Sequence, residues 1–548
     1  MRHLSFLADS TSGQDGRETI RATGRFYTSR QIGDHLVVTV WDALSPSIAA
    51  NACVRICDPF GGDGRLVVWL IEEALANGRT DIEWDVTIWD LHEPGLLSAG
   101  EKLRAISEEH GIHISVRTEI CDAIMKALVH EATFDVVVTN PPWENLKPDR
   151  REFEGLTVAD RDRYVAAIRE YDVLLGLSYP LSQPERKFAG WGTNLARVGV
   201  ETALRLVVPN GVAGIVSPAS LLADDSSVGL RKWMVTCNTM LDAAYVPAEA
   251  RQFSGADVST AIVVLQKRAS NKVAPNVTIF DAAMRPDKKG EVFHSVEFLR
   301  RTGYVIPISF GLGRMDVLQR LSCLPTWADL EIGDLWAGRE LDETGVNRWL
   351  SDVGAGRFVK GRMIDRLSIV AEPTQFVNKP GWRIPRSVSF ERIAWRDVSR
   401  PSQKRRIIAT LIPPGWITGN SLGVAHFRID DGKRVRALLA IMSSLVFEFQ
   451  LRCFLATGHV SLHALRKVHI PDLSTQNNTT MLAAVADDML LGLSRSGAHL
   501  EATAAHAYGI TASEFAQVIS AFPKVASAEA EDMLVAYEAL ASTELVVD

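Results

Sequence analysis

The chain is 548 residues long, 47% apolar and 23% charged, with a formal net charge of -7. This composition excludes disordered, collagen-like and coiled-coil proteins, and the length favours two or three domains. Asp9, Ser10 and Asp15 interrupt the short apolar patch near the start, and no later apolar stretch reaches the ~18 uncharged residues of a membrane helix. The six cysteines show neither a Cys-x-x-Cys pair nor zinc-ligand spacing. We therefore expect a cytoplasmic protein with no membrane segment, disulfide framework or metal site.

Charge is distributed unevenly along the chain, which matters more for the choice of partner than its sum. Residues 475–548 carry a net charge of -8, so the rest of the chain is close to neutral. Residues 357–406 hold thirteen Lys or Arg against four acids, a net charge of +9. One segment could therefore bind phosphates although the whole chain is acidic.

The first ~268 residues alternate short apolar runs with helical patterns. Nearly continuous β-branched runs are typical of central strands in a parallel sheet. We therefore predict a doubly wound α/β domain over residues 1–268. The expected strands are 52–60, 86–90, 114–120, 134–140, 204–218 and 261–268, and the expected helices are 66–75, 95–109 and 220–240.

The pattern changes after residue 268. Residues 269–474 contain irregular segments with Trp, Arg and Pro, whereas residues 475–548 are rich in Ala, Leu and acids. The sequence predicts a second domain of mixed α+β structure, followed by a small acidic helical tail.

A glycine-rich segment, Asp-Pro-Phe-Gly-Gly-Asp-Gly at residues 58–64, lies between an expected strand and an expected helix. Glycines there allow a tight turn and a close approach of backbone to ligand, at the sheet edge where open α/β folds bind ligands. The segment indicates a nucleotide-like cofactor. Val67 stands where dinucleotide-binding loops have a third small residue, so pyrophosphate binding is the weaker interpretation. A glycine-rich turn without a ligand is the alternative.

Two acids follow later expected strands and would project from the same edge of the sheet. A carboxylate at Asp90, after the second strand, commonly accepts hydrogen bonds from ribose hydroxyls. Asp122 could take an exocyclic amine or another polar group of the cofactor. Each acid alone is also typical of a strand-end turn or a helix cap.

The segment Asn140-Pro141-Pro142-Trp143 follows the apolar strand 134–139. Two adjacent prolines restrict the backbone and remove two N–H donors, which leaves carbonyls and an amide oxygen beside a large aromatic face. Such a cluster suits a planar amine. The alternative is a strand that is simply stopped by its prolines.

These motifs resemble the amino-group DNA methyltransferases, which transfer a methyl group from S-adenosylmethionine to adenine N6. Phe60, Gly62 and Gly64 match the family's Phe-x-Gly-x-Gly loop, and residues 140–143 match its (Asn/Asp/Ser)-Pro-Pro-aromatic motif. The resemblance is specific over residues ~20–268 and looser beyond them.

The outer parts of the chain also resemble this family. Tyr27 and Thr28 are similar to its N-terminal cofactor motif, although Ser29 stands where a Pro often follows. Residues 456–471, preceded by 415–422, resemble the closing part of the target-recognition region in Type II and IIS adenine methyltransferases. A recognition domain that comes last is the family's gamma arrangement.

The resemblance implies a Rossmann-like methyltransferase sheet with S-adenosylmethionine as cofactor and double-stranded DNA as substrate. Residues 1–268 would be catalytic, 269–474 would recognise the DNA target, and 475–548 would form the tail. The implied cofactor-binding residues are Tyr27, Thr28, Asp58, Pro59, Phe60, Gly62, Gly64, Asp90, Leu91, Asp122 and Ala123. The implied residues at the target base are Asn140, Pro141, Pro142, Trp143 and Phe253.

The implied reaction needs no metal and no covalent intermediate. Asn140 Oδ1 and the Pro141 carbonyl would hold both hydrogens of the target amine and favour a more tetrahedral nitrogen. Trp143 would stack on the flipped base. Phe253 resembles the aromatic residue on the base's other face, although a lone Phe before a strand is more often a core residue.

The basic segment predicts a DNA-binding surface, because Arg suits both phosphates and guanine edges. A solvated basic face is the alternative. A cognate endonuclease, if there is one, would be a separate chain of a restriction-modification or anti-phage system. The expected DNA-binding residues are Arg357, Lys360, Arg362, Arg383, Arg386, Arg396, Arg400 and His459.

Three alternatives stay open at this point. Asn-Pro-Pro-aromatic loops also occur in methyltransferases that act on glutamine side chains or RNA, and the same loop geometry serves cytosine N4. The chain could also be a non-catalytic DNA-binding subunit of a restriction complex. The sequence predicts neither the recognition sequence nor the oligomeric state.

Overall fold

The structure, a computed structural model, describes residues 27–544 except 149–152, 154–156, 186–190, 254–257, 270–271, 274, 292–293, 296–298, 301–302, 307–314, 344–345, 355, 401–402, 430, 456–457 and 494–495. The chain divides into two compact units, Met1–Leu312 and Gly313–Asp548.

The first unit is built on a large sheet whose described strands run in the order β10-β9-β6-β7-β5-β4-β1-β2-β3. Strands β1 to β5 pair in parallel, whereas β7 lies antiparallel between β5 and β6. β9 is parallel to β6, and β10 is antiparallel to β9. The strands are β1 (Cys53–Asp58), β2 (Glu83–Asp90), β3 (Ile114–Ile120), β4 (Phe134–Thr139), β5 (Val207–Pro218), β6 (Thr239–Val246), β7 (Thr260–Gln266), β9 (Asn276–Phe280) and β10 (Pro286–Glu291), with a small separate pair β8 (Lys272–Val273) and β11 (His294–Ser295).

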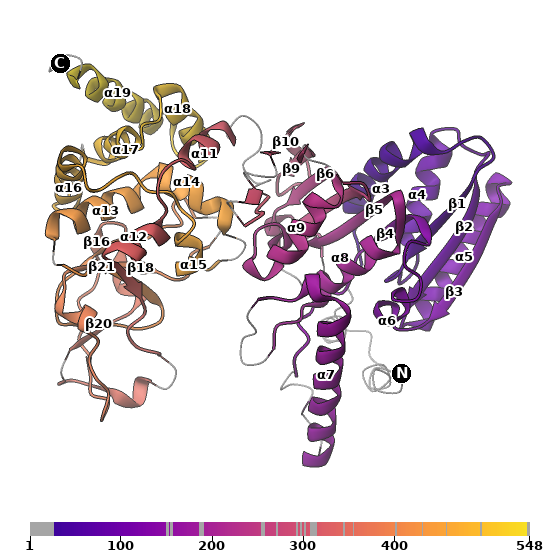
Figure 1. Ribbon diagram of the computed structural model, residues 1–548, viewed down its shortest axis with the longest axis horizontal. Helices are drawn as coiled ribbons and strands as arrows, with labels where there is room; N and C mark the ends of the chain where they lie inside the picture. The colour runs from indigo at the N-terminus through magenta and orange to yellow at the C-terminus, as the bar shows by residue number, and fades with distance from the viewer. Residues whose placement is uncertain are drawn as a thin grey trace. The chain divides into compact units, whose positions relative to one another are not determined.

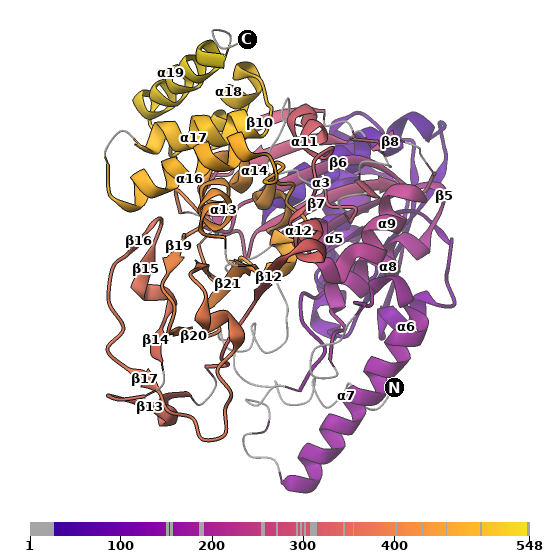
Figure 2. The ribbon, with the colours of Figure 1, turned by 60° about the vertical axis from the view of Figure 1, so that its left-hand side comes forward.

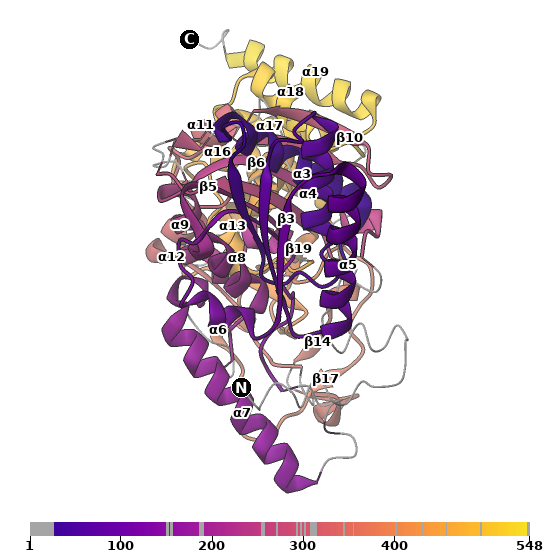
Figure 3. The ribbon, with the colours of Figure 1, turned by 90° about the vertical axis from the view of Figure 1, so that its right-hand side faces the viewer.

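Helices cover both faces of this sheet (Figure 3). One face carries α3 (Arg30–Leu44), α4 (Arg65–Ala76) and α5 (Glu93–His110). The other carries α6 (Ala123–Ala127), α8 (Leu195–Leu206) and α9 (Val228–Thr236). A parallel-rich sheet with helices on both faces confirms the predicted doubly wound α/β fold.

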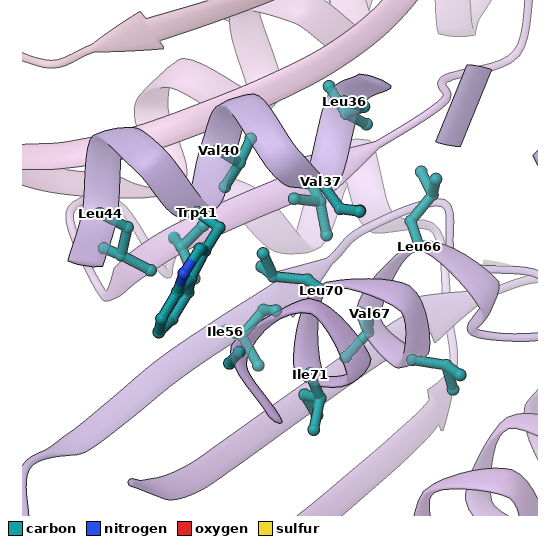
Figure 4. Close-up of a cluster of buried hydrophobic side chains, with 14 of the residues drawn as sticks. Leu36, Val37, Val40, Trp41, Leu44, Ile56, Leu66, Val67, Leu70 and Ile71 are labelled. Carbon is teal, nitrogen blue, oxygen red and sulfur yellow. The ribbon is translucent and has the colours of Figure 1, made fainter. Parts of the chain in front are cut away.

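The core of the first unit lies between the sheet and helices α3 and α4 (Figure 4). Leu36, Val40 and Leu44 recur at helical spacing on α3, so they form one apolar face. Val40 and Leu36 lie against β5, because a Cβ at Gly214 would be 2.4 Å from Val40 and 3.0 Å from Leu36. Val37 and Trp41 point instead towards Leu70 of α4 (Figure 4). This packing anchors the start of α3, and with it the segment 27–29 that enters the functional site.

Most expected elements of this unit are confirmed, and α4 and α5 end within two residues of their expected bounds. The helix expected over residues 220–240 is present but shorter, as α9. α9 begins only at Val228, because the Asp224 side chain accepts the N–H of Ser226 and turns the chain into a short 3₁₀ helix, Asp225–Ser227. The chain is already extended again in β6 from Thr239.

Residue 268, the expected end of the first domain, precedes two strands of the same sheet. The buried guanidinium of Arg231 also donates to the carbonyls of Tyr304 (3.0 Å) and Gly303 (3.1 Å), which ties this later segment to α9. The first compact unit accordingly extends beyond residue 268. The assignment of catalytic, recognition and tail roles to particular ranges stays a prediction.

A long helix, α7 (Val158–Ser178), projects from the sheet of the first unit (Figure 1). It lies in the insertion between β4 and β5. Its C-terminal part is held by Leu175, which is buried in a small cluster with Ile124 and Val198. α7 therefore reaches the sheet edge at the start of α6.

The second unit contains two small four-stranded sheets in its described part, with orders β12-β21-β18-β19 and β13-β17-β14-β20. β13, β14 and β17 lie at one end of this unit and helices α16 to α19 at the other (Figure 2). The strands are β12 (Leu335–Gly338), β13 (Leu350–Ser351), β14 (Arg357–Val359), β15 (Ile364–Asp365), β16 (Ser368–Ile369), β17 (Phe376–Val377), β18 (Arg392–Arg396), β19 (Ala409–Ile412), β20 (Trp416–Thr418) and β21 (Leu422–Phe427). The helices are α11 (Met315–Leu321), α12 (Trp327–Gly333), α13 (Gly432–Ser443), α14 (Leu445–Phe454), α15 (Leu462–Leu465), α16 (Gln476–Leu490), α17 (Ser496–Ala507), α18 (Ala512–Ser520) and α19 (Ser527–Glu544).

Among the described residues, no single helix is long and apolar enough to cross a membrane. Helices α13 and α14 together have the necessary length and composition, but the chain bends by 65° between them. Most of their side chains are buried inside the unit.

Buried ion pairs join the acidic C-terminal helices to the basic segment. Arg405 donates to Glu501 Oε1 on α17 at 2.7 Å and to Glu448 Oε2 on α14 at 3.0 Å. Arg366 donates to the same Glu501 oxygen at 3.0 Å. Both glutamates are buried, and an uncompensated buried charge is strongly destabilising. These ion pairs link the tail to the basic segment.

Candidate functional site

The predicted cofactor and target residues meet at one edge of the large sheet. β1, β2, β3 and β4 are parallel neighbours, so the segments that follow them leave the sheet on the same side. Residues 58–64, Asp90, Asp122 and 140–143 follow these strands in that order. The chain order reverses between β1 and β4, and open α/β sheets bind ligands at such a switch point.

The glycine loop adopts backbone conformations that only glycine reaches easily. Gly62 has φ of 51° and Gly64 has φ of 72°. The Gly64 N–H donates to the Gly61 carbonyl at 2.8 Å, which closes the turn that starts α4. A Cβ at Gly64 would lie 2.6 Å from that of Ala99 on α5. The loop therefore needs glycine both for its turn and for close packing beneath it.

The Asp90 carboxylate is fixed against this loop. Oδ2 accepts the N–H of Gly62 and Oδ1 accepts the N–H of His92, both at 2.8 Å. A carboxylate offers more than one acceptor position on each oxygen, so these bonds are compatible with further hydrogen bonds to a diol. Leu91, the next residue, is about half exposed (49%) at the rim.

Asp58 is a buried carboxyl at the end of β1. Burial raises its pKa to about 7, although Thr139 Oγ1 and the N–H of Phe60 donate to Oδ1 at 2.7 and 3.1 Å. Pro59, which follows it, is also buried, whereas Phe60 is only half-buried. Asp58 therefore joins β1 to β4 directly beneath the glycine loop.

Asp122 caps helix α6 and contacts a residue that the sequence did not single out. Its Oδ1 accepts the N–H groups of Ile124 and Met125, while Oδ2 accepts the hydroxyl of Tyr171 on α7 at 2.9 Å. Burial raises the pKa of this carboxyl. Ala123 is the buried first residue of α6. Tyr171 had no sequence signal, because it lies in an insertion 49 residues away.

Residues 27–29 connect the parts of the site with one another. Asn140 Nδ2 donates to Thr28 Oγ1 at 3.2 Å, and Ser29 Oγ donates to Gln252 Oε1 at 2.6 Å. Ser29 also caps α3 by accepting the N–H of Ile32. The departure from the family pattern at Ser29 thus has a local structural role as a helix cap.

Tyr27 lies over the start of α4. The guanidinium of Arg65 is 4.6 Å from the centre of the Tyr27 ring, and Arg65 Nη1 donates to the Thr28 carbonyl at 2.9 Å. Asp63 pairs with Arg65 and with Lys102 at 2.8 and 2.7 Å. A Cβ at Gly62 would be 3.4 Å from the Tyr27 ring. Arg65 and Asp63 therefore hold the N-terminal segment at the glycine loop.

The loop of residues 140–143 packs closely on helix α8. A Cβ at Gly199 would lie 2.2 Å from Pro141 Cβ, so only glycine allows α8 to approach the loop. Pro141 is buried and Pro142 is half-buried. The contact of Asn140 with Thr28 orients its amide with the NH₂ group towards Thr28.

The rings of Trp143 and Phe253 lie in contact with each other. Their ring centres are 4.7 Å apart and the planes meet at 61°. Phe253 is buried in the main core cluster, and Trp143 packs against that cluster while half-buried. Phe253 is thus a core residue that also contacts Trp143, and its place on the other face of a target base stays a prediction.

In the second unit, the predicted DNA-binding residues differ in exposure. Lys360 is half-buried over the ring of Phe358, and Arg396 is half-buried and donates to the carbonyls of Gly361 (2.9 Å) and Ile364 (3.1 Å). The guanidinium of Arg396 is thus engaged by the fold. The exposed residues of the set are Arg357, Arg362, Arg383, Arg386, Arg400 and His459.

Several arginines of the basic segment, residues 357–406, form ion pairs within the fold. Arg392 is fully buried and donates to Glu340 from Nε and Nη2 at 2.9 and 3.0 Å. Arg366 and Arg405 are paired with Glu501. The net charge of the segment therefore overstates the charge that it presents on its surface.

No protein-family model and no curated protein sequence matches this chain. Solved structures that resemble it include the Type IIL restriction-modification enzyme MmeI in complex with DNA, at a TM-score of 0.51 and 12% identity over 92% of this chain and 74% of that one. They also include a nuclease-deletion mutant of the Type ISP restriction-modification enzyme LlaGI in complex with a DNA substrate mimic, at a TM-score of 0.52 and 11% identity over 87% of this chain and 48% of that one. The chain shares the fold of these two enzymes. It spans about half of the LlaGI structure's length.

The residues at the sheet edge fit the cofactor that the motifs imply. S-adenosylmethionine presents a ribose diol and an adenine amine, which need acceptors, and Asp90 and Asp122 supply carboxylates there. Gly62 and Gly64 have positive φ angles that favour glycine, so the loop carries no side chain at these two positions. Gly62 lies beside the ring of Tyr27. The site residues and their roles stay predictions.

Proposed function

We propose that this protein is an S-adenosylmethionine-dependent DNA methyltransferase of a restriction-modification or anti-phage system, acting on adenine N6 of a flipped base. The proposal rests first on one observation. Asn140 is held by Thr28, next to the Trp143–Phe253 pair, at the same sheet edge as the glycine loop and Asp90. The shared fold with two restriction-modification enzymes supports it.

The chain's own residues act on the target amine by positioning. An exocyclic amine is a poor nucleophile, because its lone pair is delocalised into the ring. Asn140 Oδ1 and the Pro141 carbonyl accept its two hydrogens and favour a tetrahedral nitrogen, whose lone pair becomes available. Thr28 fixes the amide for this task by accepting its NH₂ group. The cofactor supplies the electrophilic methyl group.

Asp90 and the glycine loop hold the cofactor in this proposal. Asp90 binds the ribose hydroxyls with the acceptor positions that Gly62 and His92 do not use, while Tyr27 covers the loop. Asp122, which Tyr171 orients, accepts a hydrogen bond from the exocyclic amine or another polar group of the cofactor. These residues exclude water and orient the methyl group towards Asn140.

The exposed arginines of the second unit bind DNA phosphates in this proposal. Arg383 and Arg386 are the strongest candidates, because both are exposed and lie on a surface segment beside the 3₁₀ helix Arg386–Ser389. Arg357 is weaker, because it already pairs with Glu372 at 3.1 Å.

Transfer of tritium from labelled S-adenosylmethionine to duplex DNA tests the proposal directly. Asn140→Ala should lower transfer by about 100-fold or more, because the amine loses its acceptor, while cofactor affinity measured by calorimetry changes little. Asn145→Ala is the matched control, because Asn145 is exposed on the same loop and contacts Asn194. Full activity of Asn140→Ala would remove this residue from the reaction.

The identity of the methylated atom separates the alternatives. Sequencing of modified bases in DNA from cells that express the protein distinguishes adenine N6 from cytosine N4. RNA and protein offered as substrates in the same tritium assay test the other acceptors. Binding of DNA without transfer to any substrate would favour a non-catalytic subunit.

A further inference from the structure

A nearly buried carboxylate in the second unit holds two exposed basic side chains. Arg339 Nη2 donates to Asp397 Oδ1 at 2.6 Å, and His459 Nδ1 lies 3.0 Å from Asp397 Oδ2. The side chain of Asp397 is 11% exposed, whereas those of Arg339 and His459 are 53% and 63% exposed. An exposed ion pair leaves both partners mobile, but here the shared acid is fixed, so it orients both basic groups.

The backbone around Asp397 makes this orientation rigid. Its N–H donates to the Ser421 carbonyl at 2.9 Å, and its carbonyl accepts the N–H of Val460 at 2.7 Å. Ser421 Oγ accepts the N–H of Gly361 at 3.1 Å. Arg362, which is exposed, follows Gly361 directly. Segments from four parts of the second unit therefore converge on Asp397 and bring basic residues with them.

We propose that Arg339 determines sequence specificity by donating to the acceptor edge of a guanine, and that Asp397 is its positioning residue. The inference rests on the proposed DNA function and names a residue that reads the target. Guanine presents O6 and N7 in the major groove, and Arg is the usual partner of this pair. The contact with Asp397 uses Nη2 of Arg339, and a guanidinium carries further N–H donors in the same plane.

The neighbouring carboxylate favours a base edge over a phosphate. A phosphate bound by Arg339 would lie within a few ångströms of the negative Asp397, and like charges at that separation repel. A guanine edge carries only partial charges, so the same carboxylate costs little there. A fixed direction also matters for reading a base, whereas a phosphate can be held by any flexible cation.

Selection of binders from a random pool of duplex DNA by the full chain tests the inference without any need for methyl transfer. The parent protein should enrich sequences that carry a guanine at one particular position. In Arg339→Ala the preference for guanine over the other bases at that position should fall by about 10- to 100-fold. Preferences at the other positions should persist. Arg383→Ala is the matched comparison, because loss of a phosphate contact should weaken binding to all sequences alike.

Asp397→Asn gives a second readout that a merely structural acid would not give. The amide keeps the shape of the side chain but removes one negative charge. Preference for the guanine should fall, while binding to unrelated DNA should become stronger. A structural role alone would instead lower the melting temperature and weaken binding to every sequence.

The outcomes separate this inference from the proposed function. Unchanged base preferences in Arg339→Ala, or a uniform loss with a smaller salt dependence, would overturn the inference and make Arg339 a phosphate contact or a bystander. Sequence-selective binding by a parent protein that transfers no methyl group would refute the proposed activity and leave the inference intact. Methyl transfer without any sequence preference would support the proposed activity and refute the inference about Arg339.

Discussion

The indole of Trp143 and the phenyl ring of Phe253 touch each other, with ring centres 4.7 Å apart. A base stacked between two rings needs them about 7 Å apart, since each stacked contact takes about 3.5 Å. The proposed target pocket is therefore closed by its own aromatic residues in this conformation. A flipped base that enters it must separate the two rings, and we expect Trp143 to move because it is less buried than Phe253.

Trp143→Ala should therefore reduce kcat/KM by roughly ten- to a hundredfold, since a stacked base loses about 1–3 kcal/mol on alanine substitution. Trp143→Phe should keep much of the activity. DNA that carries 2-aminopurine at the target should change its fluorescence on binding the parent protein, and this change should be smaller with Trp143→Ala. Binding through the basic surface should persist in both variants.

Phe253 is unsuitable for the same test. It is buried in the main core cluster, and Phe→Ala in a core costs about 3–5 kcal/mol. A loss of activity in Phe253→Ala could therefore come from unfolding as well as from lost stacking. If Trp143 is likewise only a core residue, both Trp143 variants should lose thermal stability in proportion to lost volume, and the fluorescence response should match that of the parent.

Asp90→Ala should weaken binding of S-adenosylmethionine by about 1.5–3 kcal/mol, the usual value for a lost hydrogen bond to a charged group. Part of this effect would act through Gly62, whose N–H loses its acceptor. Calorimetry measures it. Asp85→Ala is the control, because Asp85 lies on the same strand but pairs with the exposed Arg117. Equal cofactor affinity in the two variants would exclude Asp90 from the site.

The stability of the protein should depend on pH through Asp58. Burial raises its pKa in the folded state to about 7, above the ordinary value of 3.8 for an aspartate. Between these values the folded state holds a proton that the unfolded state has lost, so the free energy of unfolding falls as pH rises. Asp58→Asn cannot titrate, and its oxygen can still accept from Thr139 and Phe60. Urea titrations at about pH 5 and about pH 8 should therefore show a smaller loss of stability on raising pH in Asp58→Asn than in the parent. Equal losses would place the titration elsewhere.

Binding to DNA should fall steeply with rising salt, because the proposed phosphate contacts release counterions. Charge reversal at Arg383 and Arg386 together should flatten this dependence. Arg392→Met is a useful contrast, because Arg392 is paired with Glu340 inside the fold. It should destabilise the protein by about 3–5 kcal/mol, as removal of one partner of a buried pair does. An unchanged salt slope in the charge-reversal variant would point to a different DNA surface.

The large sheet and the position of its ligand edge were predictable from the sequence. Apolar runs such as 134–139 are buried on both faces of the sheet, so their pattern is local and readable. The glycine loop, Asp90, Asp122 and Asn140 follow parallel strands, and parallel strands end on one side. The helix over 220–240 was not predictable in extent, because Asp224 turns the chain with a side-chain hydrogen bond.

The alternation of strands and helices from β1 to β4 and the residue types at these strand ends were readable from the sequence, since periodicity, glycine and proline act over a few neighbouring residues. Contacts between residues far apart in the chain became visible only in the folded protein. Asn140 meets Thr28 across 112 residues, and Asp122 meets Tyr171 across 49. The folded structure also determines which basic side chains are free of internal ion pairs and can contact DNA. The sequence gives the charge of Arg366 and Arg383 but does not give the partner of Arg366. Glu501 pairs with Arg366, whereas Arg383 is exposed.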